Sequence, residues 1–182
     1  MKKTTILNEQ DITNNIQEIA RQIVENNASM EDVVLVGIRT GGAFLAARLQ
    51  GAIARLNIPT PPIGILDITL YRDDWTSIGP TPVVRKTELP FSVNYKIIIL
   101  VDDVLFTGRT VRAAMDALMD YGRPKRIELA ILVDRGDSNR ELPITANYVG
   151  IVYDTALEET INVYFKEGGF SDHVAIEEKR AA

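Results

Sequence analysis

The chain has no cysteine and only one histidine among its 182 residues. The lack of cysteine excludes disulfides, zinc–thiolate sites and thiol catalysis, and one histidine, His173, is too few for a histidine-based metal cluster. No apolar run approaches the roughly 20 residues that cross a bilayer, and the basic start MKKTTILNEQ has no apolar signal core. We therefore expect a cytoplasmic protein that makes no contact with a membrane.

Positive charge is also scarce. Lys and Arg number 20 against 25 Asp and Glu, which gives a net charge of −5. This balance does not favour a general nucleic-acid binder, although a local basic face stays open. With 46% hydrophobic and 25% charged residues, the composition is typical of a globular protein rather than a disordered chain or a coiled coil. The length suits one domain, 1–182, with a sizeable core.

The spacing of apolar residues divides the chain into alternating helices and strands. From Ile12 to Val24 they recur at helical spacing, which predicts an amphipathic helix over residues 10–26. The other predicted helices are 43–55 and one that begins near Val111, and the predicted strands are 33–36, 63–70, 96–101, 127–133, 148–152 and 161–165. This alternation predicts an α/β fold with a mostly parallel central sheet flanked by helices.

Polar loops follow four of the predicted strands. They cover residues 39–42, 71–74, 102–110 and 134–137. In open parallel sheets, ligands bind outside the carboxyl ends of the strands, so we expect these loops to converge on one site. Residues 71–95 form a polar stretch with three prolines and no clear period, and irregular segments of this length are usually functional or disordered.

The loop after the most aliphatic strand combines two kinds of chemistry. Asp102 and Asp103 follow Ile97–Val101, and Thr107–Thr110 then lead into a helix. A helix start offers free backbone N–H groups to an anion, and Gly108 lets the backbone approach it. Carboxylates suit sugar hydroxyls or hydrated Mg²⁺, so a ribose 5-phosphate would satisfy both halves. The alternative, that the aspartates only terminate the strand, fits an adjacent pair followed by T-G-R-T poorly.

Residues 101–110, VDDVLFTGRT, resemble the phosphoribosyl pyrophosphate (PRPP) motif of the type I phosphoribosyltransferases. Further stretches, VGIRTGG at 36–42, DITLYRDD at 67–74, LVDRG at 132–136 and RELPI at 140–144, resemble the PyrR family of bifunctional pyrimidine operon regulators and uracil phosphoribosyltransferases. The resemblance runs from about Ile6 to Ile176. It implies that uracil and PRPP form UMP and pyrophosphate with Mg²⁺ as the cofactor.

The resemblance also implies roles for individual residues. Asp102 and Asp103 would be catalytic and would hold the ribose hydroxyls, directly or through Mg²⁺ and water. The loop at Arg39 and Thr40 would hold pyrophosphate, residues 71–90 would form a mobile lid, and a small hood of residues 134–182 plus N-terminal elements would cover uracil. The implied substrate-binding residues are Arg39, Thr40, Arg72, Val104, Leu105, Phe106, Thr107, Gly108, Arg109, Thr110, Asp134 and Val163.

Three positions qualify this assignment. Purine-using relatives carry an acid three residues after the second aspartate, where this chain has Phe106, which favours a pyrimidine acceptor unless the ring only packs the loop. The family commonly has a basic residue where Gly41 stands, so another group would have to compensate in binding pyrophosphate. Arg135 has two open interpretations: it pairs with Asp134 or Asp137, or it contacts the nucleotide.

RNA binding is the alternative function that the resemblance implies, as attenuation at a pyrimidine messenger leader by a uridine-nucleotide-bound homodimer or higher oligomer. The first helix offers only Arg21 as a basic residue, and residues 136–139 carry Asp137. Because phosphate contacts dominate RNA affinity, we expect RNA binding to be weak or absent. The open alternative is a smaller basic patch made by Arg21, Arg123, Lys125, Arg126 and Arg140.

Overall fold

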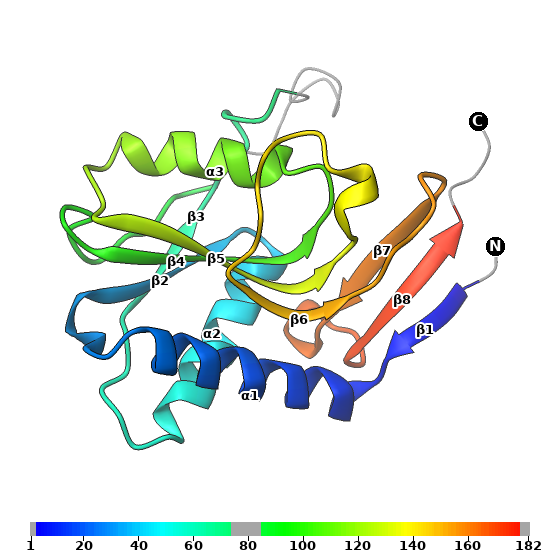
Figure 1. Cartoon of the computed structure of the whole chain (residues 1–182), viewed down its shortest axis with the longest axis horizontal. Coiled ribbons are helices and arrows are strands. Elements are labelled where there is room, and N and C mark those ends of the chain that lie inside the picture. Colours follow the sequence, from blue (N-terminus) through cyan, green and yellow to red (C-terminus); the bar gives the residue numbers. More distant parts are fainter. Residues whose placement is uncertain (1–2, 74–84, 179–182) are drawn as a thin grey trace.

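The computed structural model describes residues 3–73 and 85–178. Its centre is a five-stranded parallel sheet with the strand order β3-β2-β4-β5-β6. Figure 1 shows α1 (Glu9–Asn26) and α2 (Gly41–Ala54) on one face of this sheet and α3 (Arg109–Met119) on the other. The strands are β2 (Val33–Ile38), β3 (Ile63–Leu66), β4 (Ile97–Leu105), β5 (Arg126–Asp134) and β6 (Tyr148–Val152). The predicted α/β class is confirmed.

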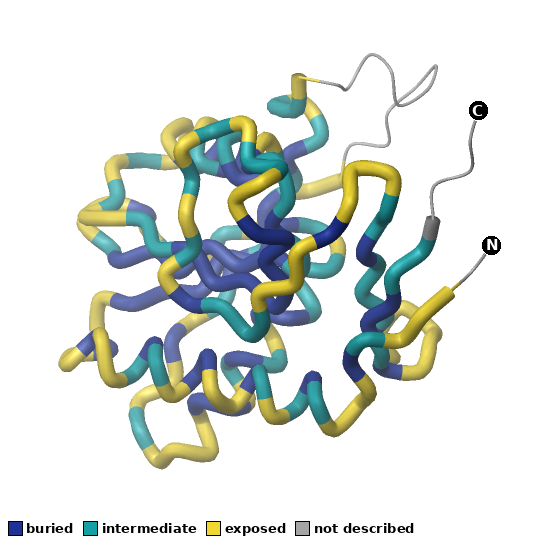
Figure 2. Tube along the Cα trace, turned by 45° about the vertical axis from the view of Figure 1, so that its right-hand side comes forward, coloured by how far each residue is buried: buried dark blue, intermediate teal, exposed yellow. Residues whose placement is uncertain are grey.

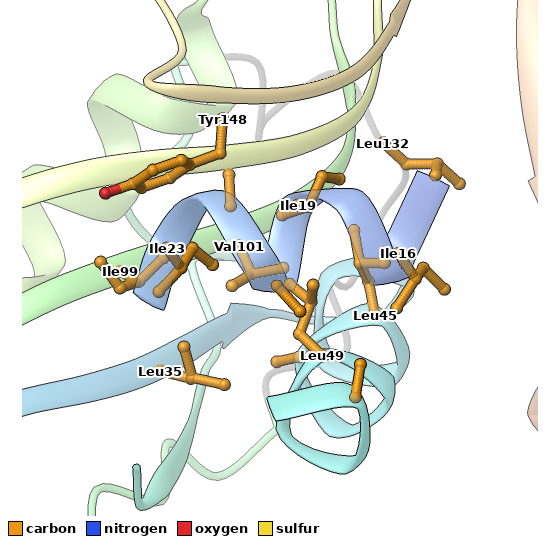
Figure 3. Close-up of a cluster of buried hydrophobic side chains, with 14 of the residues drawn as sticks. Ile16, Ile19, Ile23, Leu35, Leu45, Leu49, Ile99, Val101, Leu132 and Tyr148 are labelled. Atoms are coloured by element: carbon orange, nitrogen blue, oxygen red, sulfur yellow. The ribbon is translucent and has the colours of Figure 1, made fainter. Parts of the chain in front are cut away.

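The core consists of two hydrophobic clusters separated by the parallel sheet. Along β4, Ile97, Ile99 and Val101 pack toward α1 and α2, whereas Ile98 and Leu100 pack toward α3. This alternation follows from the two-residue period of a strand. Figure 3 shows the first cluster, and Figure 2 shows the buried strands lying inside exposed helix surfaces and loops.

Helix α1 begins where its end groups are satisfied by side chains. The Asn8 side-chain oxygen Oδ1 accepts hydrogen bonds from the backbone N–H groups of Gln10 and Asp11, and the Asp11 carboxylate accepts one from the Asn8 N–H at 2.9 Å. This reciprocal capping box stabilises the first turn. From there Ile12, Ile16 and the apolar residues beyond them bury one face against the sheet.

At three strands the predicted carboxyl end is wrong by two residues or more. Strand β2 continues past Val36 to Ile38, because β3 still pairs with it there. Strand β3 ends at Leu66 rather than at residue 70, because the Asp67 carboxylate accepts hydrogen bonds from the Thr69 N–H (2.8 Å) and hydroxyl (2.5 Å) and turns the chain. Strand β4 continues past Val101 to Leu105, because β5 still pairs with it there, with Leu105 opposite Asp134. Helices α2 and α3 each begin two residues earlier than expected.

A second, antiparallel sheet lies beyond the carboxyl ends of the parallel strands (Figure 1). It has the order β1-β8-β7 and consists of β1 (Lys3–Leu7), β8 (His173–Glu178) and β7 (Glu159–Tyr164). We call it the hood sheet. Its position agrees with the predicted small hood.

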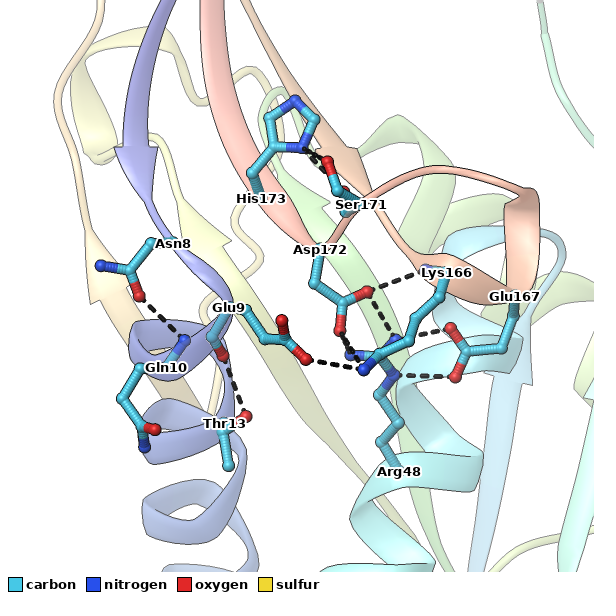
Figure 4. A network of polar contacts seen from close by, with 10 residues as sticks. All are labelled: Asn8, Glu9, Gln10, Thr13, Arg48, Lys166, Glu167, Ser171, Asp172 and His173. Carbon is cyan, nitrogen blue, oxygen red and sulfur yellow. Dashed lines mark hydrogen bonds and ion pairs between the residues drawn. The ribbon is translucent and has the colours of Figure 1, made fainter.

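An ion-pair network fastens the hood sheet to the helices (Figure 4). Arg48 of α2 makes two 2.8 Å contacts with the buried Asp172 carboxylate and also pairs with Glu167. Lys166 reaches Glu9 at the start of α1, at 2.6 Å. Because Asp172 and Glu167 lie on the connection between β7 and β8, this network holds the hood sheet over the edge of the parallel sheet.

The remaining described elements are short. Three 3₁₀ turns cover Met30–Asp32, Asp137–Asn139 and Lys166–Gly168 in the described part of the chain. Within that part, none of the helices has both the length and the hydropathy needed to cross a bilayer. Of the predicted lid, residues 74–84 lie outside the described residues.

Candidate active site

A cavity of about 560 Å³ opens where β4 runs into α3. Its wall is a continuous segment, residues 104–111, joined by Arg72 and Asp73 from the chain after β3. Eight of the predicted substrate-binding residues therefore surround one space: Arg72, Val104, Leu105, Phe106, Thr107, Gly108, Arg109 and Thr110. That they bind substrate stays a prediction.

The loop at the start of α3 has the geometry of an anion-binding turn. Gly108 caps the helix with φ of 91°, a left-handed conformation that glycine adopts without strain. Its carbonyl accepts the first helical hydrogen bond, from Arg112 N–H at 3.0 Å. The Thr107 carbonyl is held by the N–H groups of Glu141 and Leu142, at 3.1 and 3.2 Å. The initial N–H groups of a helix lack partners within it, so this turn can bind a phosphate.

Asp102 and Asp103 are held in β4 by backbone contacts. The Asp103 N–H donates to Asp102 Oδ1 at 3.0 Å, and the Val104 N–H donates to Asp103 Oδ1 at 2.9 Å. Strand β2 pairs with β4 only as far as Val101, so the two aspartates extend past that neighbour. They lie within β4 rather than past its end, where the sequence predicts them, and neither is among the residues that line the cavity.

Burial makes the aspartate pair receptive to positive charge. Asp102 is only 7% exposed. Burial and the carboxylate of Asp103 raise the pKa of Asp102 well above its usual value, while the positive charge of Arg72 acts in the opposite direction. Burial also raises the pKa of Asp103. A cation placed here would relieve both effects.

The donor set fits Mg²⁺ that arrives with a substrate. Among the described residues, no three or more His, Cys, Asp or Glu side chains are grouped to hold a metal. Asp102 and Asp103 offer carboxylate oxygens, and Mg²⁺ is commonly held by one or two carboxylates together with water and substrate phosphates. The two aspartates therefore suit a Mg²⁺ ion whose other ligands are water and substrate phosphates, rather than one held only by protein side chains.

Helix α2 begins directly against the aspartate pair. A Cβ added at Gly41 would lie 2.0 Å from Asp103 Oδ2, and one at Gly42 would lie 2.2 Å from the Val101 carbonyl oxygen. Only glycine fits at either position without displacing its neighbour. The basic side chain that the family resemblance implies at position 41 would therefore clash with this placement of Asp103.

Arg39 and Thr40 precede α2 and do not line the cavity beside α3. Arg39 Nη2 donates to the Lys86 carbonyl at 3.0 Å and lies 3.7 Å from Glu88 Oε1. The peptide between Arg39 and Thr40 is cis, and Thr40 caps α2. Pyrophosphate binding by this loop stays a prediction.

Asp134 and Val163 also lie outside the cavity wall. Asp134 is buried in an ion pair with Arg140, at 2.6 Å, and also accepts a hydrogen bond from the Gly136 N–H. Val163 lies in β7 and packs against the core cluster of α1 and α2. Neither contact depends on a ligand.

The contacts of Arg135 exclude one of its two open interpretations, an ion pair with Asp134 or Asp137. It pairs with neither Asp134 nor Asp137, because its side chain donates instead to Thr155 Oγ1 and to two backbone carbonyls. Its guanidinium lies 3.7 Å from the centre of the Phe106 ring. Sequence reasoning missed this stack, although the position of Arg135 at the end of a predicted strand placed it near the site.

The comparisons with known proteins give the class first. The family model of the phosphoribosyl transferase domain matches residues 3–153. Among solved structures, a hypoxanthine phosphoribosyltransferase of Trypanosoma cruzi superposes with a TM-score of 0.71, covers 97% of both chains and is 17% identical. Another structure of that enzyme gives a TM-score of 0.73 with 95% of this chain covered. These structures show a shared fold, and the site lies on a phosphoribosyltransferase fold.

Relatives that match most of this chain identify a narrower group within the phosphoribosyltransferases. The bifunctional protein PyrR of Syntrophobacter fumaroxidans is 50% identical over 97% of this chain and 94% of the relative. The one from Pelotomaculum thermopropionicum is 52% identical over 96% of each, and the one from Chloroflexus aurantiacus is 52% identical over 94% of this chain and 93% of the relative. The chain therefore belongs to the phosphoribosyltransferase family and, within it, to the bifunctional PyrR proteins, as its motifs predict.

Proposed function

We propose that the protein transfers the phosphoribosyl group of PRPP to N1 of uracil and releases pyrophosphate. In this reaction the bond between ribose C1 and the pyrophosphate oxygen breaks, a C1–N1 bond forms, and the N1 proton of uracil passes to the released pyrophosphate or to water. The observation that supports the proposal most is the juxtaposition of buried Asp102, half-buried Asp103 and a phosphate-type turn in nine successive residues, 102–110. A ribose 5-phosphate needs both.

Each half of the site would act on a different part of PRPP. The turn at 107–110 would bind the 5-phosphate. Asp102 and Asp103 would hold the ribose hydroxyls and stabilise the positive charge that grows at C1 as pyrophosphate departs. Arg39 and Arg72 would offset the charge of the pyrophosphate. Asp102 and Asp103 would also hold Mg²⁺, which when bound would supply positive charge that offsets the charge of the leaving group.

The acceptor would lie against Phe106. This ring lines the cavity at the position where purine-using relatives have an acid. A carboxylate that could pair with a purine ring is therefore absent from position 106, which favours a pyrimidine. Asp134 would contribute by orienting Arg140, which donates to the Phe106 carbonyl, and Val163 would contribute as part of the hood sheet.

An assay of acceptor use tests the proposal. Purified protein with PRPP and Mg²⁺ is incubated with labelled uracil, hypoxanthine or guanine, and the nucleotide products are separated. UMP should form and should disappear when EDTA removes Mg²⁺. Use of hypoxanthine at a rate equal to or above that of uracil would overturn the pyrimidine assignment.

The relatives are bifunctional proteins, and the resemblance to the PyrR family implies that the second function is the regulation of pyrimidine genes. We propose that its contact with leader RNA is weak in this protein. Arg21, on the exposed surface of α1, is paired with Glu18 at 2.6 Å and with Glu25. Arg140 is buried in its pair with Asp134, so it cannot join an exposed basic patch.

Filter binding to a pyrimidine-operon leader RNA tests this second proposal. With UMP present and salt varied, we expect affinity weaker than micromolar and a shallow dependence on salt. Sub-micromolar, sequence-selective binding with a steep salt dependence would show that the remaining basic residues suffice.

We also propose that the protein is a homodimer or a higher homo-oligomer. Large apolar side chains are exposed around the end of α3, where Tyr95 is 77%, Met119 54% and Tyr121 49% exposed. Exposed apolar groups gathered in this way are typical of protein interfaces. Light scattering after size-exclusion chromatography should give a mass of at least two chains, and a monomer mass at micromolar concentration would contradict the proposal.

A further inference from the structure

The Phe106 side chain is held by a residue that the PRPP motif does not contain. The Arg135 guanidinium lies 3.7 Å from the ring centre, well inside the range of cation–π attraction. A second arginine fixes the backbone, because Arg140 donates to the Phe106 carbonyl while pairing with Asp134. Two arginines that follow β5 therefore determine where this part of the cavity wall lies.

Arg135 also contacts the connection that leads from β6 into the hood sheet. It donates to Thr155 Oγ1 at 2.6 Å and to the carbonyls of Ala156 and Glu159 at 3.0 Å each. The Phe106 ring and the 155–159 segment are thus joined by one guanidinium. A shift of the Phe106 ring or of residues 155–159 therefore has to alter the contacts of Arg135 with the other.

The burial of Arg135 is costly and demands specific contacts. The residue is only 3% exposed, and its side chain donates to the neutral oxygens of Thr155, Ala156 and Glu159 rather than to a carboxylate. Burial lowers its pKa, and the charge of Glu159 partly opposes that change. If Arg135 only filled space, an apolar residue of similar size at this position would give a more stable protein. Its contacts with the cavity wall and the hood connection give it a use in the site.

We propose that Arg135 is a positioning residue for the acceptor base, which fixes the Phe106 ring in the cavity wall and links it to the hood connection. The proposal deepens the uracil phosphoribosyltransferase function and rests on it. Arginine suits this role because its guanidinium is flat and carries several N–H donors in fixed directions. A lysine keeps the charge but can neither cover the ring in this way nor reach three acceptors in the same geometry.

Steady-state kinetics on four variants tests the positioning role: Arg135→Lys, Phe106→Leu, the double variant, and Arg123→Lys as a matched control. Arg123 is exposed and follows the carboxyl end of α3, whereas the cavity lies at the start of that helix. Arg135→Lys should raise KM for uracil about tenfold, equivalent to about 1.4 kcal/mol, and should leave KM for PRPP within about twofold. The control should match the wild type.

The double variant separates positioning from general support of the fold. If Arg135 acts through the ring, Arg135→Lys in the Phe106→Leu background should change KM for uracil less than about threefold, because contacting residues are not additive. Fully additive effects, or equal rises in KM for uracil and PRPP, would overturn the proposal. An unchanged KM for uracil in folded Arg135→Lys would also overturn it.

Hydrogen exchange tests the link between the cavity wall and the hood connection without relying on the proposed reaction. In Arg135→Lys, amide exchange should accelerate in residues 104–110 and 153–159 and stay unchanged in α1, as followed by mass spectrometry. If the wild type fails to use uracil while this pattern is present, the proposed function is wrong and the link between the two segments stands. If uracil is used and exchange is unchanged in both segments, the link itself is refuted.

Discussion

Replacing Gly41 with alanine should inactivate the enzyme without unfolding it. The added methyl group would lie 2.0 Å from Asp103 Oδ2 and 2.6 Å from Asp103 Cγ. Non-bonded atoms do not approach this closely, so the carboxylate has to move by roughly 1 Å or more, and a misplacement of about 1 Å can cost 10²-fold in rate. We expect kcat/KM to fall about 100-fold, which corresponds to about 2.7 kcal/mol.

The same helix provides a matched control. A Cβ built on Gly51 meets nothing within 4 Å. Gly51→Ala should therefore keep full activity and stabilise the fold by about 0.5–1 kcal/mol, because alanine is the better helix former. Gly42→Ala differs again: its Cβ would lie 2.2 Å from the Val101 carbonyl oxygen, a backbone atom, so stability should fall along with activity.

Two measurements decide the outcome for Gly41. Initial rates with PRPP and uracil give kcat/KM, and thermal unfolding followed by circular dichroism gives Tm, in which each kcal/mol corresponds to about 2–4 °C for a domain of this size. Gly41→Ala with wild-type kcat/KM would show that the position of Asp103 does not matter for the reaction. Loss of activity together with a collapse of Tm would show that position 41 supports the fold instead.

Three further predictions concern the aspartate pair and the opposite edge of the sheet. Asp103→Asn should lower kcat/KM roughly 10²-fold or more with an unchanged circular dichroism spectrum; wild-type turnover would remove Asp103 from the mechanism. Asp102→Asn should raise Tm at pH 7, because the pKa of Asp102 is raised in the folded protein and its buried charge lowers stability once pH rises through that pKa. In melts below pH 3.8, the usual pKa, the carboxyl is protonated in the folded and the unfolded protein, so the gain in Tm should vanish. A gain in Tm that does not depend on pH would contradict this prediction. Tyr148→Phe should cost about 1–2 kcal/mol in urea unfolding, because the Tyr148 hydroxyl donates to Glu128 at 2.6 Å and accepts from Asn27 at 3.2 Å; an unchanged midpoint would refute this.

The sheet could be predicted because its residues obey a simple pattern. Buried aliphatic runs separated by helical periodicity gave all five parallel strands and the three helices near their observed places. The strand ends were harder. Two adjacent aspartates indicate the end of a strand, yet β4 continues through Asp102 and Asp103 because β5 supplies partners there. That pairing depends on another strand about thirty residues away, which no local pattern reveals.

The candidate site also combines residues whose position could be predicted with residues whose position could not. Residues 104–110 were predicted to lie together and do line one cavity, because they are consecutive in the chain. Asp134 and Val163 were assigned by resemblance and are not in that cavity lining; Asp134 pairs with Arg140 and Val163 packs in β7, so their part in binding substrate stays a prediction. The contact of Gly41 with Asp103 depends on how α2 approaches β4, a distance that the sequence does not contain.

The hood sheet has a consequence for the order in which the protein acquires its parts. Its central strand β8 pairs with β1, so that Lys3 lies opposite Glu177 and Thr4 opposite Ile176. A ribosome completes residues 33–152, which hold all the parallel strands and the turn at the start of α3, before it reaches β7 and β8. Since domains can begin to fold during synthesis, the phosphate-type turn can form on the nascent chain while β1 still lacks its partner. The hood sheet is then the last of the two sheets to form, because β1 cannot pair until β8 has been synthesised.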